Sequence, residues 1–211
     1  YKNNIIPLFL NNVMQHLYSV FLKFCIFTAK SIKKYRSVKQ ALPLIQKLMA
    51  GIYIHVPFCK TRCIYCDFYS TTQSSLQPKY VSALCKELVQ RKEYLDSESV
   101  ETIYFGGGTP SQLSYEELTA IFQTITENYR VTENAEVTME ANPDDLSSTY
   151  LSLLRKLPFN RISMGIQTFH DGTLKLLKRR HSALQAFEAF KKSRVAGFNN
   201  ISIDLMYGLP G

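Results

Sequence analysis

The sequence predicts an α/β fold in which helices cover a parallel sheet. Short apolar, β-branched runs alternate along the chain with segments of helical periodicity, which is the pattern of repeated strand–helix–strand units. The chain has 211 residues, of which 45% are hydrophobic, and this is enough to bury one sizeable core. An open doubly wound sheet and a barrel of strand–helix units both fit. In either fold, functional residues gather at the carboxyl ends of the strands.

Five runs are predicted as strands because they are apolar and rich in β-branched residues. They cover residues 52–56, 100–105, 135–140, 161–166 and 200–206. Pro57 ends the first run, and three glycines that begin at Gly106 end the second. The chain stops directly after the fifth run, so we expect a fold that is truncated there.

Four segments between these strands are predicted as helices, over residues 79–94, 114–128, 146–157 and 182–196. The second begins with Ser114-Tyr-Glu-Glu, the pattern of a capping box. Pro158 follows the third and Gly197 the fourth, and both residues commonly end helices. Cys85 lies among apolar residues of the first helix and is expected to be a buried core thiol.

Charge is distributed unevenly along the chain. The formal net charge is +8, which taken alone suggests nucleic acid or an anionic membrane as a partner. Residues 1–48, however, carry eight basic and no acidic side chains, so 17 of the 25 basic residues and all 17 acidic residues lie in residues 49–211. The larger part is neutral overall, and we expect it to present no nucleic-acid surface.

Residues 1–48 are interpreted as a basic N-terminal extension that is not part of the native protein, followed by one domain over residues 49–211. Met49 lies directly before the first strand, where a natural start would be. Polar residues interrupt the apolar stretches before it, so none reaches the roughly 20 residues that a membrane-spanning helix needs. A basic amphipathic helix on a membrane surface stays open as an alternative.

Three cysteines follow the first strand within eight residues, in the run Cys59-Lys-Thr-Arg-Cys63-Ile-Tyr-Cys66. This spacing lets a short loop wrap one compact metal centre, and thiolates select iron–sulfur clusters, zinc or Cu(I). Three ligands on a four-iron cluster leave one iron open for another molecule. A zinc site with His55 as fourth ligand and a chance cluster of core cysteines are the alternatives, and a disulfide does not suit three thiols.

A glycine loop and a lone acid follow the next two strands. Glycines at 106–108 allow a close backbone approach to a ligand, but the loop lacks the spacing of a phosphate-binding loop. A tight strand-to-helix turn is its plain alternative. Glu140 ends the third predicted strand, where a charge needs a partner unless it is a solvated strand end.

Five sequence motifs in order resemble one family. They are Tyr53-Ile-His-Val-Pro-Phe-Cys59 with its cysteine run, Gly106-Gly-Gly-Thr-Pro110, Glu140-Ala-Asn-Pro143, Gly165-Ile-Gln167 and Asp204-Leu-Met-Tyr-Gly-Leu-Pro210. Over residues 49–211 the chain resembles the radical S-adenosylmethionine (SAM) enzymes, within the oxygen-independent coproporphyrinogen III oxidase group. The resemblance implies a partial (βα)6 barrel, an incomplete relative of the TIM barrel, truncated here after its fifth strand.

The resemblance also implies cofactors and their contacts. Cys59, Cys63 and Cys66 would bind a [4Fe-4S] cluster, SAM would chelate the open iron, and an electron from the cluster would cleave SAM to a 5′-deoxyadenosyl radical. The expected SAM contacts are Tyr53, Tyr65, Gly107, Gly108, Thr109, Glu140, Gln167, Arg179 and Asp204. Tyr53 has a core position as its alternative.

Arg179 belongs to the basic run 178–181, which by itself would be a solvated face, but its guanidinium suits the SAM carboxylate. Lys178 and Arg180 are expected on the surface. His170 and His181 are expected to be ordinary surface or capping residues.

Within the group, the chain resembles the HemW type of heme-binding chaperone more than the coproporphyrinogen III dehydrogenase. The dehydrogenase typically has a further cysteine two positions after the third cluster cysteine, where this chain has Phe68. The Leu-x-Arg-Arg-His motif at 177–181 agrees with HemW, although HemW proteins more often have Gly where Lys178 stands. Whether the protein is an enzyme therefore stays open, as does a structural metal-binding module.

The resemblance implies heme or porphyrin as a ligand, an electron donor for the cluster and a heme-receiving protein as a further partner. Iron–sulfur chemistry needs a reducing compartment, so a cytoplasmic location is expected, with membrane association left open.

Overall fold

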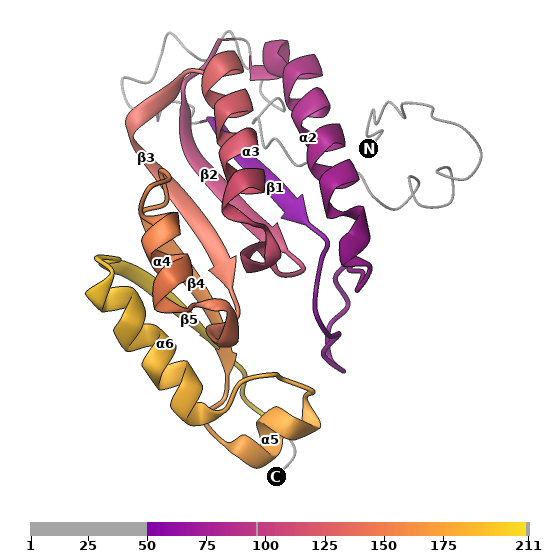
Figure 1. Ribbon diagram of the computed structural model, residues 1–211, viewed down its shortest axis with the longest axis vertical. Helices are drawn as coiled ribbons and strands as arrows, with labels where there is room; N and C mark the ends of the chain where they lie inside the picture. The colour runs from indigo at the N-terminus through magenta and orange to yellow at the C-terminus, as the bar shows by residue number, and fades with distance from the viewer. Residues whose placement is uncertain (1–49, 96, 210–211) are drawn as a thin grey trace, which may run out of the picture.

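The structure, a computed structural model, describes residues 50–95 and 97–209 (Figure 1). The interpretation of residues 1–48 falls outside them. Five parallel strands form one sheet, and the order of the strands in the sheet is their order in the chain. They are β1 (Ala50–Val56), β2 (Val100–Gly107), β3 (Val131–Ala141), β4 (Arg161–Gln167) and β5 (Asn200–Leu205). All five predicted strands are confirmed.

Helices connect successive strands. The α-helices are α2 (Gln77–Gln90), α3 (Tyr115–Asn128), α4 (Ser148–Leu154), α5 (Asp171–Leu176) and α6 (Ala183–Val195). Short 3-10 turns are η2 (Ser74–Leu76), η3 (Lys92–Leu95), η4 (Pro110–Gln112) and η5 (Pro143–Asp145). Both bonds of the capping box at Ser114 form with Glu117. The helix predicted over residues 146–157 is shorter at both ends: Ser147 caps its start, and Arg155 follows its last residue, Leu154. Helix α5 was not predicted.

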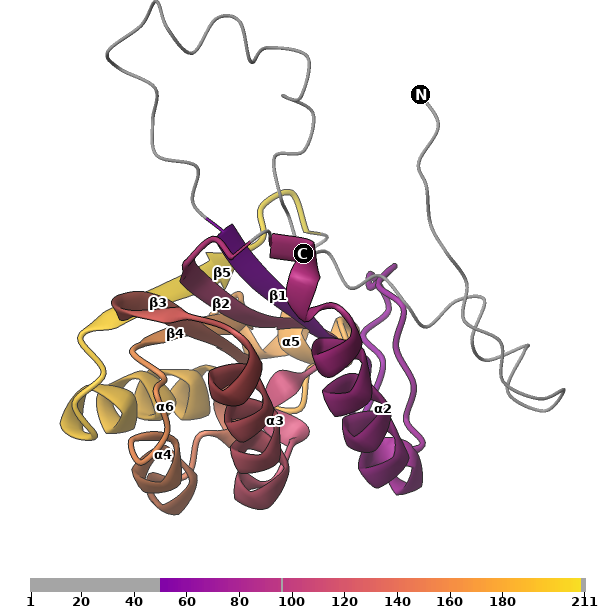
Figure 2. The same ribbon diagram turned by 90° about the horizontal axis from the view of Figure 1, so that it is seen from above.

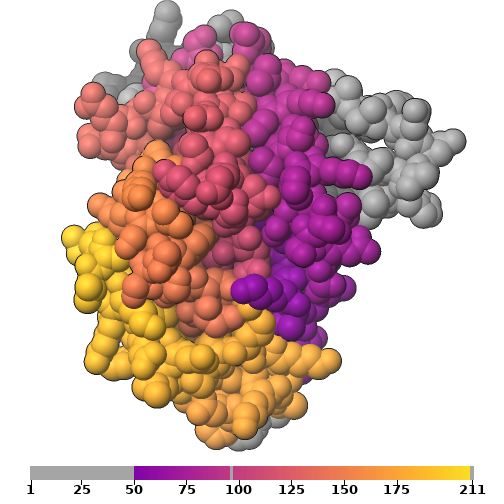
Figure 3. All heavy atoms as spheres, viewed as in Figure 1, coloured from indigo at the N-terminus to yellow at the C-terminus, as the bar shows by residue number. Residues whose placement is uncertain are grey.

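The crossover helices α2, α3, α4 and α6 all lie on one face of the sheet (Figures 1 and 2). A doubly wound sheet reverses its strand order at a switch point and carries helices on both faces. This sheet does neither, so it is part of a barrel of βα units, as predicted. In the space-filling view, the helices form a continuous outer layer that follows the order of the chain (Figure 3). Among the described residues, no helix has the length and apolarity to cross a membrane.

The core lies between the sheet and these helices. In β1 every second residue is buried, beginning with Ala50, which is the period of a strand with one covered face. An aromatic cluster fills the middle of the core: the ring centroids of Phe105, Phe122 and Phe159 are 5.1 to 5.4 Å apart. Cys85 is half-buried and packs against this core, so its predicted core position is confirmed only in part.

The other face of the sheet is polar. Ser202 donates a hydrogen bond to Ser163 at 3.0 Å, and Arg161 donates to Ser202 at 2.9 Å and to Thr138 at 3.2 Å. These side chains come from the neighbouring strands β3, β4 and β5. The concave side of the partial barrel is therefore lined by polar groups that lead to the carboxyl ends of the strands.

The β3–β4 pair is extended by a side chain. The amide of Asn160, just before β4, donates to the Ala135 carbonyl at 2.7 Å and accepts from the Val137 N–H at 2.8 Å. Together with the backbone bond from the Asn160 N–H to the Val137 carbonyl at 3.1 Å, these bonds extend the pairing beyond its first registered pair, Thr138 and Arg161.

We predict that Asn160→Ala lowers the free energy of unfolding by about 1 kcal/mol, because both backbone groups lose their partner. Urea denaturation followed by circular dichroism measures this. Asn199→Ala, at an exposed asparagine, is the control and should change stability by less than about 0.5 kcal/mol. Equal losses in the two variants would contradict the role of Asn160.

Candidate functional site

A pocket of about 270 Å³ opens at the carboxyl ends of the strands. Eleven of the twelve predicted site residues line it; they are Cys59, Cys63, Tyr65, Cys66, Gly107, Gly108, Thr109, Glu140, Gln167, Arg179 and Asp204. They come from the cysteine loop, from the ends of four strands and from the segment after α5. Tyr53 does not line the pocket. Its ring stacks on that of Tyr104 with centroids 5.9 Å apart, beneath the site.

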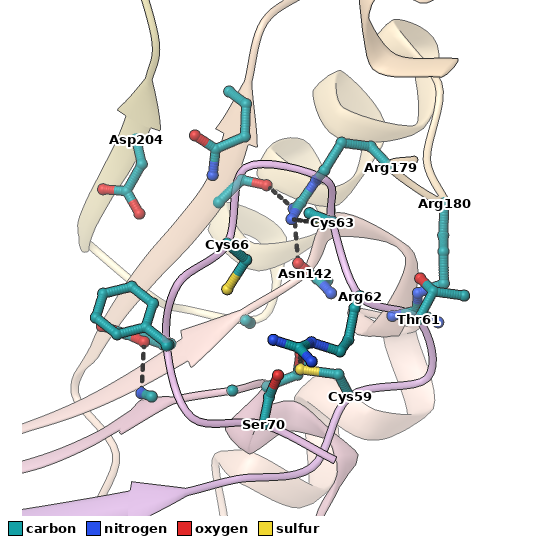
Figure 4. A pocket seen from close by; sticks show the side chains of 18 of the residues that line it. Cys59, Thr61, Arg62, Cys63, Cys66, Ser70, Asn142, Arg179, Arg180 and Asp204 are labelled. Atoms are coloured by element: carbon teal, nitrogen blue, oxygen red, sulfur yellow. Dashed lines mark hydrogen bonds between the residues drawn. The ribbon is translucent and has the colours of Figure 1, made fainter. Parts of the chain in front are cut away.

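The cysteine loop, residues 59–71, is closed at its base by backbone hydrogen bonds. The N–H of Cys59 donates to the carbonyl of Thr71 at 2.9 Å, and the N–H of Thr71 donates to Pro57 at 2.7 Å. Beyond this neck the loop curls around the pocket, with Cys59 and Cys66 directed into the enclosed space (Figure 4).

Two of the thiols have polar neighbours. The Thr109 hydroxyl donates to Cys59 Sγ at 3.3 Å, and Arg179 Nη1 lies 3.5 Å from Cys63 Sγ. Burial raises the pKa of the Cys59 thiol, and the hydrogen bond from Thr109 opposes this shift.

The zinc alternative finds no support in this geometry. Among residues 50–95 and 97–209, no three His, Cys, Asp or Glu side chains converge where a single metal ion would sit. His55 Nε2 instead lies 3.0 Å from the Tyr69 carbonyl. In a four-iron cluster each cysteine binds a different iron, so a spread of thiols over one loop suits a cluster better than a single ion.

The glycine loop is locked against the end of β1. The N–H groups of Gly108 and Thr109 donate to the Val56 and Phe58 carbonyls, both at 2.8 Å. A Cβ at position 108 would lie 2.8 Å from the Val56 oxygen, so only glycine fits there. The N–H of Gly107, at φ +106°, donates to Glu140 at 3.2 Å. With these three N–H groups bonded, the loop is no phosphate cradle.

Glu140 lies at the end of β3 with neutral partners. Besides Gly107, the Tyr104 hydroxyl donates to its carboxylate at 2.6 Å. Burial raises the pKa of Glu140, while the bonds from Tyr104 and Gly107 lower it. The ion pairs of the described residues involve neither Glu140 nor Asp204, so two carboxylates face the pocket without a paired cation.

Arg179 is a half-buried cation, and it has no acidic partner among the described residues. Its Nη2 donates to Asn142 Oδ1 at 2.6 Å and to the Gly165 carbonyl, and its Nη1 lies 3.5 Å from the Tyr65 hydroxyl (Figure 4). Burial raises the pKa of Tyr65 to about 12. Arg179 Nε is buried and bonded to nothing. The charge of this guanidinium would attract an anion in the pocket.

Comparison with known proteins assigns this arrangement to a family. The sequence pattern described as "Radical SAM superfamily" matches residues 53–211. The chain belongs to the radical SAM superfamily. The resemblance inferred from the motifs is thereby confirmed at the level of the family.

Individual relatives carry two kinds of name. The chain is 41% identical to the heme chaperone HemW of Bacillus subtilis, over 77% of this chain and 44% of the relative. It is 33% identical to an oxygen-independent coproporphyrinogen III oxidase of Synechocystis, over 78% of this chain and 36% of the relative. The solved structure of coproporphyrinogen III oxidase (HemN) from Escherichia coli superposes with a TM-score of 0.70 at 32% identity, over 75% of this chain and 37% of that chain. The chain thus spans less than half the length of these relatives.

Radical SAM membership implies a [4Fe-4S] cluster and SAM as cofactors. The pocket contains the donor types that these groups need. Three thiols on one loop suit an iron–sulfur cluster. The Arg179 guanidinium, which lines the pocket and has no acidic partner among the described residues, suits a carboxylate.

Two residues near the radical SAM pocket have a left-handed backbone. Gln167, at the end of β4, has φ +71°, and Lys178 has φ +57°. Left-handed conformations cost most residues about 1 kcal/mol or more. The conformation of Lys178 explains why glycine suits this position. Lys178 is exposed, as predicted.

The prediction that Arg180 is a surface residue was wrong. Its side chain is only 17% exposed and pairs with Asp144 at 2.7 Å and with Asp145 at 3.2 Å. The sequence analysis gave no role to Asn142, which lines the pocket, or to Asp145, which pairs with Arg180 without lining the pocket. Asn142 belongs to a motif that we recognised, but its contact with Arg179 spans 37 positions in the chain.

The two histidines differ. His170 caps α5, since its side chain accepts a hydrogen bond from the Thr173 N–H at 3.3 Å, as predicted. His181 is buried rather than at the surface, with 4% exposure, and its Nε2 lies 3.2 Å from the Ile166 carbonyl. Because a carbonyl only accepts, Nε2 carries the proton. Burial, followed by the charges of Arg179 and Arg180, lowers the pKa of His181 to about 4, and the hydrogen bond to Ile166 and the charge of Asp171 oppose this shift.

We predict that His181 makes the protein acid-sensitive between about pH 6.5, its pKa in an unfolded chain, and about pH 4. In this window the unfolded chain binds the proton and the folded protein does not, so the free energy of unfolding falls as the pH falls. His181→Gln should lose less stability than the wild type over the same window in urea denaturation. The carboxylates titrate in both proteins and cancel in the comparison. Parallel pH profiles would contradict the prediction.

Proposed function

We propose that Cys59, Cys63 and Cys66 hold the [4Fe-4S] cluster of this radical SAM protein. The support is that the three thiols share one loop with a closed neck and line one pocket. When bound, the cluster supplies the electron that cleaves SAM. The chain itself contributes the loop that encloses the cluster, with the Thr109 hydroxyl directed at Cys59.

The remaining predicted residues, apart from Tyr53, are proposed to bind SAM. The observation that carries this assignment is the charge pattern: Glu140 and Asp204 lack a paired cation, and Arg179 lacks a paired anion, around one pocket. The amino-acid part of SAM has an ammonium and a carboxylate, which match these groups. Tyr65, Gly107, Gly108, Thr109 and Gln167 complete the proposed lining. Tyr53 would act indirectly, through its stacking on Tyr104.

We further propose that the protein is a HemW-type heme chaperone in a reducing, cytoplasmic compartment. Relatives named as HemW heme chaperones at 35 to 41% identity support this, as does position 68. Here Phe68 lines the pocket as a residue that is 65% exposed, where the dehydrogenase typically has a further cysteine. Heme, an electron donor and a heme-receiving protein would be the partners. Oxidative decarboxylation of coproporphyrinogen III is the second candidate, supported by the relative and solved structure with that name.

The cluster assignment predicts that Cys59→Ala removes most of the iron and sulfide that the anaerobically reconstituted protein binds, because a four-iron cluster loses one of its three protein ligands. Colorimetric iron and sulfide determination measures this. Cys85→Ala, at a half-buried cysteine on α2, is the matched control and should leave both contents unchanged. Unchanged iron in Cys59→Ala would refute the assignment.

The choice between the two functions requires the full-length, reconstituted protein. We expect stable heme binding in an anaerobic absorbance titration and no conversion of coproporphyrinogen III in a separate assay with SAM and reductant. Formation of protoporphyrinogen without stable heme binding would reject the chaperone and favour the oxidase.

A further inference from the structure

Asp145 is the most densely bonded carboxylate of the described residues. Its side chain is only 3% exposed. Its Oδ1 accepts from Lys60 Nζ at 3.0 Å, and its Oδ2 accepts from Ser111 at 2.9 Å and from Gln112 at 2.6 Å. Arg180 Nη2 lies 3.2 Å from both oxygens. One buried carboxylate thus connects the cysteine loop, the segment after the glycine loop, the end of β3 and the segment after α5.

Asp145 does not line the pocket itself, but its two cationic partners adjoin residues that do. Lys60 follows Cys59 directly, and Arg180 follows Arg179 directly. Arg180 and Arg179 lie on the same side of the cysteine loop (Figure 4). The contacts of Asp145 with Lys60 and Arg180 therefore hold the chain at two positions, each next to a residue that lines the pocket.

The Lys60–Asp145 contact is the ion pair that joins the cysteine loop to the rest of the described structure. Lys60 is 57% exposed, and water screens so exposed a charge, so the pair adds little to folding stability. Its effect is geometric: it restricts the loop on the Cys59 side. The Arg180 pair is better shielded from water, and removing its carboxylate would leave a half-buried cation without that partner.

We propose that Asp145 is a positioning residue that sets the cysteine loop and Arg179 relative to each other. It couples the cluster site to the SAM-carboxylate site without touching either cofactor. The proposal rests on the proposed roles of Cys59 and Arg179. Residues of this kind, which orient ligands from behind, change cofactor affinity by about tenfold or more when they are altered.

The test is Asp145→Asn in the full-length, anaerobically reconstituted protein, with two readouts that do not depend on activity. We expect the Kd of SAM, measured by equilibrium dialysis, to rise about tenfold. We also expect the cluster to lose iron to a chelator faster than in the wild type.

Glu87→Gln is the matched control, because Glu87 on α2 is also largely buried, at 12% side-chain exposure, and pairs with Arg91 at 2.7 Å away from the pocket. It should lower thermal stability without changing SAM affinity or iron loss. Lys60→Met removes an exposed side chain and leaves Asp145 paired with Arg180. It should accelerate iron loss and leave the SAM affinity near that of the wild type.

These variants separate positioning from folding. If Asp145→Asn behaves like Glu87→Gln, losing thermal stability with unchanged SAM affinity and iron loss, the proposal is overturned. If Asp145→Asn does not fold, Lys60→Met decides, and an unchanged rate of iron loss then overturns the proposal. A wild type that takes up no iron would instead refute the proposed function.

Discussion

Strand order is the constraint on which the rest of this structure depends. Parallel strands that succeed one another in the sheet as in the chain require every crossover to return on the same side, because such crossovers keep one hand. The helices therefore cover one face from β1 to β4, while Ile203 and Leu205 of β5 stay exposed on that side. The other face is left to polar side chains. All five carboxyl ends meet at one edge, so residues from Cys59 to Asp204 surround a single pocket. The concentration of chemistry at this edge follows from topology rather than from any single contact.

The electrostatics of the pocket are local. Residues 49–211 carry equal numbers of acidic and basic side chains, so the net charge of this part does not attract a charged ligand. Instead, Glu140 and Asp204 stand apart from Arg179 and Arg180, and only Arg180 is neutralised by acidic neighbours. Separated, uncompensated charges of opposite sign favour a zwitterionic ligand over a simple anion or cation.

The sequence predicted what depends on local chemistry. Apolar, β-branched runs located all five strands, the capping box at Ser114 located one helix start, and short motifs located eleven residues of the pocket. It missed what depends on the folded chain. Lys60 and Asp145 are 85 positions apart, so no motif indicates that they pair. Arg180 and Arg179 are neighbours in one basic run, and only the packing after α5 decides which of them is neutralised. His181 was misplaced for the same reason.

The closed neck of the cysteine loop lies between the sheet, which needs regular backbone hydrogen bonds, and the loop itself, which must present three cysteines. The backbone bonds between Pro57, Cys59 and Thr71 complete the wall of the barrel without any side chain of the loop. Chain between two anchored points can change in length and sequence at small entropic cost. The position of the two ends of the loop therefore depends on main-chain groups, while the spacing of the three thiols depends on the chain between those ends.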